Sequence, residues 1–515
     1  MPQTERKKKV LKSVIAQIFY TIILVVLGFV SRKIFVVYLS KELLGLNGLL
    51  TSIIGMLSLA ELGVGEAINY SLYKPLAEED NESVKTIMDL YKKCYIAIGI
   101  AIVILGIVIM PVLPYLCKTS IKMAYVYKVY VLFLLDAGLS YCLAYSRNII
   151  SADQKDYIVT NVDSVSQIII TLFQVIVLIH THSYIIYLAV KIGIVFVRNF
   201  YLHKKSLKLF PYLKEKNITP IGTAEKKSLI ENVKALFVIK VATYCVQGTD
   251  NMLLSAFCSL GAVAIYGNYT MIFYYLNQVS SVIFTKARAS VGNYLQTEDV
   301  EKGYILFKNF FFINFIIVSL VSTGVFGVSD KILILWLGED FVWPLGLIGI
   351  IAFNNYSRNI LQACEVFRGA AGLYSPRKFV KYLALFEGAL NLVASVFCIK
   401  ILNMGEYGVF VGTFISTLVS TIAVPWIVYR FLFKKSLKEY YAIYFKYMIT
   451  GLLVLFLSRF IVEQIYLESL IITIAIGIIV CVSVTVVVYT ILFGRSEEFQ
   501  YLVDLIKKIM KRKNA

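Results

Sequence analysis

Several cationic side chains, among them Arg32, Arg147, Lys240 and Arg358, fall within or at the ends of long apolar stretches of this 515-residue chain. A charge placed in the hydrocarbon of a membrane costs roughly 2.5–3.5 kcal/mol on insertion scales, so such residues are expected to face water, a partner or a ligand. The guanidinium fork of arginine matches the oxygens of a phosphate group, and lysine adds a compact charge. The sequence therefore predicts an anion-binding site that is built from Arg32, Arg147, Lys240 and Arg358.

Two of these arginines lie in a repeated pentapeptide. The sequence Tyr-Ser-Arg-Asn-Ile occupies residues 145–149 and returns at residues 356–360. The repeat predicts that Arg147 and Arg358 hold equivalent places in two halves of the chain that run in the same direction through a membrane. Two interpretations stay open for this pair: contact with a phosphate group, or anchoring of a helix end at the membrane surface.

Two acidic residues complete the set of candidate site residues. Glu61 lies in the segment Ala-Glu-Leu-Gly-Val-Gly-Glu at residues 60–66, and we expect this carboxylate to bind a coupling cation. The glycines beside it have a simpler explanation, because small residues allow helices to approach closely. Asp250 is expected at the depth of Arg32, where the two side chains either pair across the halves as an outer gate or pair within one half.

The elements that carry these residues are apolar helices. With 59% hydrophobic and 16% charged residues, the chain has too little polar surface for a soluble globule. Apolar runs such as residues 94–117 and 470–493 exceed the roughly 20 residues that a helix needs to cross a bilayer. They lack the strict alternation of a membrane β-barrel. The expected fold class is an all-α polytopic membrane protein with about fourteen transmembrane helices.

These spans suggest two lobes and an appendix. Six helices each are expected in an N-lobe and a C-lobe that are related by a parallel repeat, followed by two C-terminal helices. The expected boundaries are 1–203 for the N-lobe, 204–229 for a cytoplasmic linker, 230–435 for the C-lobe and 436–515 for helices 13 and 14 with a cytoplasmic tail. The expected spans lie near residues 12–39, 44–71, 94–116, 123–146, 158–180, 184–203, 230–256, 260–284, 303–328, 345–367, 379–399, 407–430, 441–462 and 467–493.

The placement of charged and other polar residues predicts the orientation of the chain in the membrane and argues against several classes of function. Most of the 51 Lys and Arg residues fall in the termini and in alternate loops, which predicts that both termini are cytoplasmic. Because these charges are scattered, the net charge of +19 does not indicate a nucleic-acid partner. The eight cysteines form no C-x-x-C pair, and the sequence contains no ATP-binding loop and no H-E-x-x-H motif. We therefore expect no enzyme, metal or cofactor, and the choice between H⁺ and Na⁺ as a coupling ion stays open.

Several motifs resemble one family of exporters. Leu-Leu-Gly-Leu-Asn-Gly at residues 43–48, Gly-Thr-Asp-Asn at 248–251 and Trp-Leu-Gly-Glu-Asp at 336–340 resemble Wzx-type flippases of polysaccharide repeat units. These flippases form a branch of the multidrug/oligosaccharidyl-lipid/polysaccharide (MOP) exporter superfamily, and the resemblance covers most of the chain. It implies flipping of undecaprenyl-pyrophosphate-linked oligosaccharides across the bacterial cytoplasmic membrane, with membrane lipids and a polysaccharide polymerase as partners.

Two other functions remain open beside this one. A cation-coupled multidrug exporter of the same superfamily would prefer an acidic cleft, whereas cations outnumber carboxylates among the residues expected in the membrane. A noncatalytic scaffold of a polysaccharide-assembly complex would tolerate neutralisation of those charges. The interpretation as a flippase assigns substrate binding to Arg32, Arg147, Lys240 and Arg358, and it assigns coupling or gating to Glu61 and Asp250.

Overall fold

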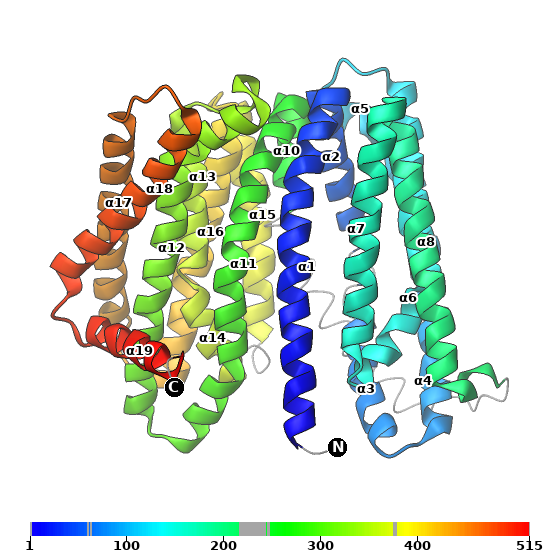
Figure 1. Cartoon of the computed structure of the whole chain (residues 1–515), viewed down its shortest axis with the longest axis horizontal. Helices are drawn as coiled ribbons and strands as arrows, with labels where there is room; N and C mark the ends of the chain where they lie inside the picture. Colours follow the sequence, from blue (N-terminus) through cyan, green and yellow to red (C-terminus); the bar gives the residue numbers. More distant parts are fainter. Residues whose placement is uncertain are drawn as a thin grey trace. The chain divides into compact units, whose positions relative to one another are not determined.

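The fold is built from helices throughout. A computed structural model of the chain describes residues 3–58, 61, 64–215, 244, 248–373 and 378–513. Within those ranges the regular elements are all helical and no strand occurs (Figure 1), which confirms the predicted all-α class. By its internal contacts the chain separates into two compact units, residues 1–264 and residues 265–515, which we describe in turn.

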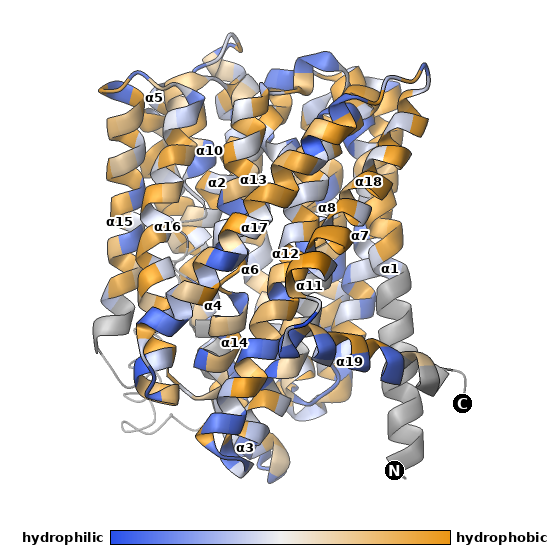
Figure 2. Ribbon diagram, turned by 90° about the vertical axis from the view of Figure 1, so that its left-hand side faces the viewer, coloured by the Kyte–Doolittle hydropathy of each residue, from blue (hydrophilic) through white to orange (hydrophobic). Residues whose placement is uncertain are grey.

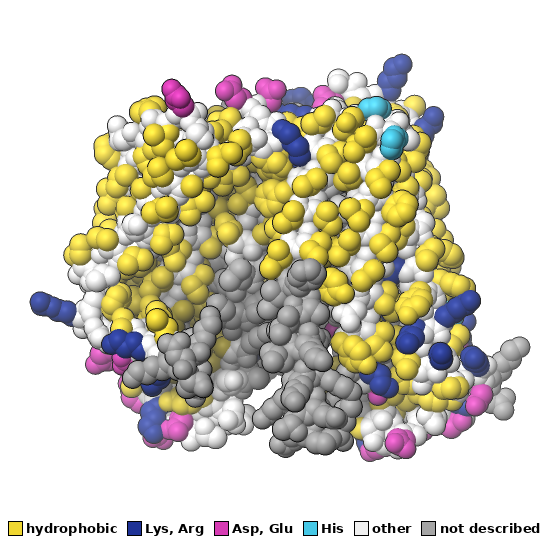
Figure 3. Space-filling view, in the orientation of Figure 1, with side chains coloured by type: hydrophobic (Ala, Val, Ile, Leu, Met, Phe, Trp, Pro, Cys, Tyr) yellow, Lys and Arg dark blue, Asp and Glu magenta, His cyan; other side chains and the backbone are white. Residues whose placement is uncertain are grey.

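The protein is a multi-pass membrane protein. Ten helical stretches in the described ranges are long and apolar enough to cross a membrane. Hydrophobic residues occupy the middle of these helices, and hydrophilic residues gather toward their ends (Figure 2). On the face that Figure 3 shows, Lys, Arg, Asp and Glu lie mainly at the upper and lower ends, and the side chains between them are mostly hydrophobic.

Unit 1 consists of the helices up to residue 264. Helix α1 packs against α7, and α4 and α8 each pack against α6. The elements are α1 (Gln3–Tyr38), α2 (Lys41–Leu57), α3 (Val64–Ala77), α4 (Asn81–Ile109), η2 (Met110–Val112), α5 (Leu113–Leu116), α6 (Met123–Ala152), α7 (Asp156–Thr181), α8 (Tyr184–Leu209), η3 (Pro211–Lys214), α10 (Asp250–Leu253) and the π-helical turn η4 (Leu254–Cys258).

The helix expected at residues 44–71 is interrupted. Helix α2 begins after Ser40, whose hydroxyl accepts a hydrogen bond from the Leu43 amide at 3.2 Å, and it ends at Leu57. Helix α3 begins only at Val64. Gly63 and Gly65 flank that start, and glycine destabilises a helix by roughly 1 kcal/mol relative to alanine. The single span predicted from hydropathy is therefore wrong here, and Glu61 lies in the interruption.

Unit 2 contains long helices around α12. Helices α17 and α18 pack on α12 and on each other, and α15 packs along α16. Helix α19 runs across the ends of these helices instead of along them (Figure 1). The elements are α11 (Leu260–Thr297), which begins just before the unit, α12 (Val300–Leu337), η5 (Glu339–Phe341), α13 (Leu345–Asn359), α14 (Gln362–Ala370), α15 (Lys378–Lys400), α16 (Glu406–Val428), the π-helical turn η6 (Tyr429–Phe433), α17 (Leu437–Glu463), α18 (Leu470–Phe493) and α19 (Glu497–Lys513).

Aromatic side chains form the core between α12, α17 and α18. The rings of Phe315 and Tyr447 stack with centroids 4.3 Å apart, and Tyr489 and Phe493 pack against Phe315. Such aromatic pairs contribute roughly 0.5–1.5 kcal/mol each beyond the area they bury. The two C-terminal helices, which have no counterpart in the predicted repeat, are therefore firmly packed parts of unit 2.

Some sequence-based boundaries are not reproduced. The count of about fourteen spans is not confirmed, and most of the helix expected at residues 230–256 lies outside the described residues. The span expected at residues 345–367 is divided into α13 and α14. Helix α8 continues to Leu209, inside the segment expected to be a linker. The lobe and linker boundaries themselves stay predictions.

Candidate functional site

In unit 1, the repeated pentapeptide occupies the last turns of α6. Ser146 and Ile149 are 1% and 0% exposed, and Ser146 Oγ lies 2.7 Å from His203 Nδ1 of α8. Arg147 donates from Nη2 to the Asp163 carboxylate of α7. Arg198 Nε lies 3.6 Å from the other oxygen of that carboxylate. Two arginines thus share one carboxylate, and Asp136 contributes a further negative charge near Arg198.

Glu61 is held by tyrosine hydroxyls. Tyr95 of α4 donates to Glu61 Oε1 at 2.7 Å, and Tyr141 of α6 donates to Oε2 at 2.6 Å. Tyr91 and Asn148 extend this hydrogen-bonded group, since Asn148 Nδ2 donates to the Tyr91 hydroxyl. The expected carboxylate is therefore half-buried and lies among polar groups of α4 and α6.

The other predicted residues of unit 1 lie apart from this group. Arg32 of α1 is half-buried and interacts electrostatically with Tyr187 of α8. Asp250 is 5% exposed at the start of α10, where the neighbouring Asn251 donates to Ser52 Oγ at 2.9 Å. The gate that pairs Arg32 with Asp250 stays a prediction, and Lys240 lies outside the described residues.

In unit 2, the second pentapeptide occupies the end of α13 and shows a similar burial pattern. Ser357 and Ile360 are 2% and 0% exposed, as their counterparts are in unit 1. Arg358 differs from Arg147, because its Nη2 atom is buried and has no hydrogen-bond partner among the described residues. Its charge is compensated at longer range by Glu387 of α15, which accepts a hydrogen bond from the Ser420 hydroxyl of α16.

A second unsatisfied donor lies beside Arg358. Asn355 stands one helical turn earlier on the same face of α13. Its Oδ1 accepts hydrogen bonds from Asn277 at 2.7 Å and from Asn359 at 2.9 Å, whereas its Nδ2 is buried without a partner in the described ranges. Buried donors without an acceptor are costly, so two of them on one helix face indicate a place for an oxygen-rich ligand or water.

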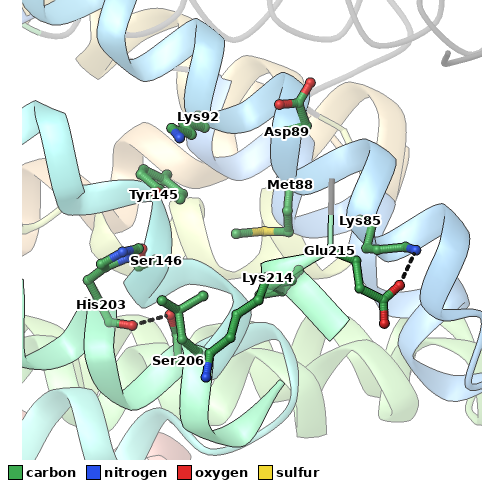
Figure 4. Close-up of a pocket in the computed structure, with 12 residues that line it drawn as sticks. Lys85, Met88, Asp89, Lys92, Tyr145, Ser146, His203, Ser206, Lys214 and Glu215 are labelled. Carbon is green, nitrogen blue, oxygen red and sulfur yellow. Dashed lines mark hydrogen bonds and ion pairs between the residues drawn. The ribbon is translucent and has the colours of Figure 1, made fainter. Parts of the chain in front are cut away.

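A polar cavity of about 480 Å³ opens between α4, α6, α8 and η3 of unit 1 (Figure 4). On one wall, Lys85 pairs with Glu215 at 2.8 Å and with Glu82 at 2.6 Å. Ser146 and His203 line it too, so it begins at the pentapeptide. In the adjoining turn, burial raises the pKa of Tyr212 to about 12.

Sequence reasoning missed this cavity and all three tyrosines of the hydrogen-bonded group around Glu61. Lys85 and Glu215 are 130 residues apart, and no spacing rule joins them. The sequence signal for this group was the pair Tyr91 and Tyr95, which lie one helical turn apart on α4. Two hydroxyls on one face of a membrane-spanning helix need hydrogen-bond partners from a neighbouring element. Among the described side chains, no group of three or more His, Cys, Asp and Glu is arranged to hold a metal ion.

Comparison with known proteins identifies the fold. No family model and no curated protein matches the sequence. The lipid II flippase MurJ in an inward closed conformation aligns over 93% of this chain and 99% of its own, with a TM-score of 0.64 at 15% identity. An inward-facing multidrug resistance MATE transporter of the MOP superfamily aligns over 79% and 94%, with a TM-score of 0.55 at 13% identity. The chain has the fold of a MOP-superfamily transporter.

A third structure agrees with this MOP fold. The MATE transporter VcmN of Vibrio cholerae aligns over 83% of this chain and 97% of its own, with a TM-score of 0.53 at 12% identity. These neighbours are transporters or flippases and not enzymes. At such identities the likeness shows the MOP architecture, and the Wzx-type branch, the substrate and the roles of single residues stay predictions.

Proposed function

We propose that the protein is a flippase that moves undecaprenyl-pyrophosphate-linked oligosaccharide repeat units from the inner to the outer leaflet of the bacterial cytoplasmic membrane, for cell-surface polysaccharide biosynthesis. The likeness to the lipid II flippase supports this, since it extends over 93% of the chain, against 79% and 83% for the two MATE transporters. The motifs that resemble Wzx-type flippases support it independently.

The observation that carries the proposal is the unsatisfied pair of donors on α13. Arg358 Nη2 and Asn355 Nδ2 are buried, and neither has a hydrogen-bond partner among the described residues. A pyrophosphate offers several charged oxygens, and a charge-assisted hydrogen bond to such a group is roughly twice as strong as a neutral one. An anionic head group would therefore satisfy both donors at once, whereas a cationic drug would meet the Arg358 charge unfavourably.

The proposal extends to the other cationic residues that the sequence singles out. Arg32, Arg147 and Lys240 would provide further contacts to the anionic head group as the two lobes expose it alternately to each side. Both termini and most basic loops would lie in the cytoplasm. A polymerase that consumes the flipped repeat unit on the outer side would pull the reaction forward.

The test is a flipping assay in cells that lack their own repeat-unit flippase. Wild type, Arg358→Ala and Arg358→Lys are compared at equal membrane levels, and the lipid-linked oligosaccharide on each face is quantified. We expect wild type to move the substrate, Arg358→Ala to accumulate it on the cytoplasmic face, and Arg358→Lys to recover part of the activity. If wild type moves no lipid-linked oligosaccharide, or if Arg358→Ala equals wild type, the proposal is wrong.

The MATE neighbours favour one alternative, a cation-coupled multidrug exporter. Such an exporter would extrude cationic dyes from the same cells, and Arg358→Ala would preserve or increase this efflux. A noncatalytic scaffold would instead restore polysaccharide assembly equally well with every charge variant. The flipping assay and a dye-efflux assay on the same strains separate these outcomes.

A further inference from the structure

The interruption between α2 and α3 holds a carboxylate inside a cage of tyrosines. Tyr91, Tyr95 and Tyr141 are 0%, 2% and 9% exposed, and two of their hydroxyls donate to Glu61. A metal ion that also used these hydroxyls as ligands would require them to turn their hydrogens away and present oxygen lone pairs to it. A proton needs no such rearrangement of ligands, because it binds directly to a carboxylate oxygen.

One hydroxyl in this cage has two acceptors at the same distance. Tyr91 Oη lies 3.4 Å from Tyr95 Oη and 3.4 Å from the backbone oxygen of Gly65, in the first turn of α3. Asn148 Nδ2 donates to Tyr91 Oη, so the hydroxyl hydrogen of Tyr91 is available for one acceptor or the other. A tyrosine hydroxyl rotates to suit its surroundings, and this one has two complete arrangements.

We propose that Glu61 is a proton-binding site whose occupancy reverses the hydrogen-bonded chain from Glu61 through Tyr95 and Tyr91 to Gly65. With Glu61 ionised, Tyr91 donates to Tyr95, and Tyr95 donates to Glu61 Oε1. When Oε1 takes up a proton, it donates to Tyr95 Oη, Tyr95 donates to Tyr91 Oη, and Tyr91 donates to the Gly65 oxygen. One proton is gained, the hydroxyls of Tyr95 and Tyr91 reorient, and no donor is left without an acceptor.

The reversal links protonation to the start of α3. Gly65 is the second residue of α3, and in the proposed reversal its carbonyl oxygen accepts the Tyr91 hydroxyl only in the protonated state. This inference rests on the proposed function and deepens it. It identifies the coupling ion as a proton and places the proton-binding site in unit 1. Among the described side chains, the titratable groups that interact with Glu61 are Tyr91 and Tyr95 from α4 and Tyr141 from α6, and the Glu66 side chain of α3 is not among those described.

The test is a pH titration by infrared difference spectroscopy on the full chain in lipid nanodiscs, without substrate. We expect a protonated-carboxyl band that appears as the pH falls and is absent in Glu61→Gln. Tyr141→Phe removes a donor to the carboxylate, so its midpoint shifts to higher pH, by about one pH unit. Tyr91→Phe leaves the Tyr95 hydroxyl without an acceptor in the protonated state, so its midpoint shifts to lower pH.

A pair of glycine variants provides a matched control. A Cβ atom at Gly65 would lie 3.0 Å from Tyr95 Oη and 3.2 Å from Tyr91 Oη, so Gly65→Ala displaces the chain and shifts the midpoint. A Cβ atom at Gly193 of α8 would meet nothing within 4 Å, so Gly193→Ala leaves the titration unchanged. Opposite shifts in the two tyrosine variants are not expected from a site that is merely structural.

The inference and the proposed function fail in different ways. If no carboxyl band depends on Glu61, or if Tyr141→Phe and Tyr91→Phe shift the midpoint in the same direction, the proton site is wrong even when wild type flips its substrate. If the titration behaves as expected, the proton site stands even when wild type moves no lipid-linked oligosaccharide.

Discussion

Arg147 and Arg358 occupy the same position of a repeated pentapeptide, yet the structure gives them different surroundings. Arg147 donates to Asp163, whereas Nη2 of Arg358 is buried without a hydrogen-bond partner in the described ranges. The backbone pattern around both is alike, since the serine before each arginine and the isoleucine after it are buried. The two pentapeptides thus share a burial pattern, and the neighbours of each arginine decide whether its charge is compensated locally or is available to a ligand.

The first prediction concerns the compensated arginine. Arg147→Ala leaves Asp163 without its closest partner, and both side chains are about one-third exposed, at 30% and 32%. We expect a loss of about 1 kcal/mol, between the values for exposed and buried pairs. Thermal unfolding of the purified protein measures it, and the double variant with Asp163→Asn should recover part of the loss. Equal stability of Arg147→Ala and wild type would contradict this.

A second prediction concerns the ion group that joins α17 to α12. Arg459 is 9% exposed and donates to Asp330 at 2.9 Å, to Glu463 at 2.8 Å, and to the backbone oxygens of Phe326 and Gly327 at 3.3 Å. Arg459→Ala leaves the Asp330 charge poorly compensated inside the helix bundle, which typically costs about 3–5 kcal/mol.

The readout is the unfolding temperature of wild type, Arg459→Ala and Arg459→Ala with Asp330→Asn. We expect a large decrease for the single variant and a partial recovery for the double variant, because the second substitution removes the uncompensated charge. A double variant that unfolds below the single one would show that Asp330 stabilises the bundle through other partners.

A third prediction concerns the close approach of α18 to α12. A Cβ atom at Gly327 would lie 2.6 Å from Cys481 Sγ, and one at Gly477 would lie 2.6 Å from Val328 Cγ1. Gly327→Ala therefore forces the two helices apart, and overpacking of this kind costs about 1–3 kcal/mol. Gly324→Ala, on the same helix, is the control, since a Cβ atom there would meet nothing within 4 Å. Thermal unfolding should separate the two variants, and equal unfolding temperatures would show that α18 can move away without cost.

Hydropathy predicted the apolar spans, because a membrane imposes length and composition on every helix that crosses it. It missed the interruption between α2 and α3. The glycines near Glu61 permit a break, but the break is held where Tyr95 and Tyr141 donate to the carboxylate. Those hydroxyls come from helices distant in the chain, so a local window could not find it.

In the candidate site, too, local sequence patterns indicated residues but not their partners from other helices. The pentapeptide repeat pointed to Arg147 and Arg358, and their equivalence in two halves of the chain stays a prediction. The repeat could not indicate that Asp163 satisfies one of them, because that pair depends on how α6 packs against α7. Long-range pairs such as Lys85 with Glu215 were out of reach for the same reason.

The last prediction concerns this long-range pair, which fastens residues 210–215 to α4. The Lys85 side chain is 3% exposed and lies 2.8 Å from Glu215. Lys85→Met keeps the length of the side chain and removes the charge, so we expect the backbone amides of residues 210–215 to exchange with solvent several-fold faster. Lys93→Met is the matched control, since Lys93 pairs with Asp89 on the same helix but is 72% exposed. Hydrogen exchange measured by mass spectrometry on wild type and both variants decides the question: faster exchange in Lys85→Met alone shows that the pair anchors this segment, whereas unchanged exchange shows that buried Phe210 suffices to hold it.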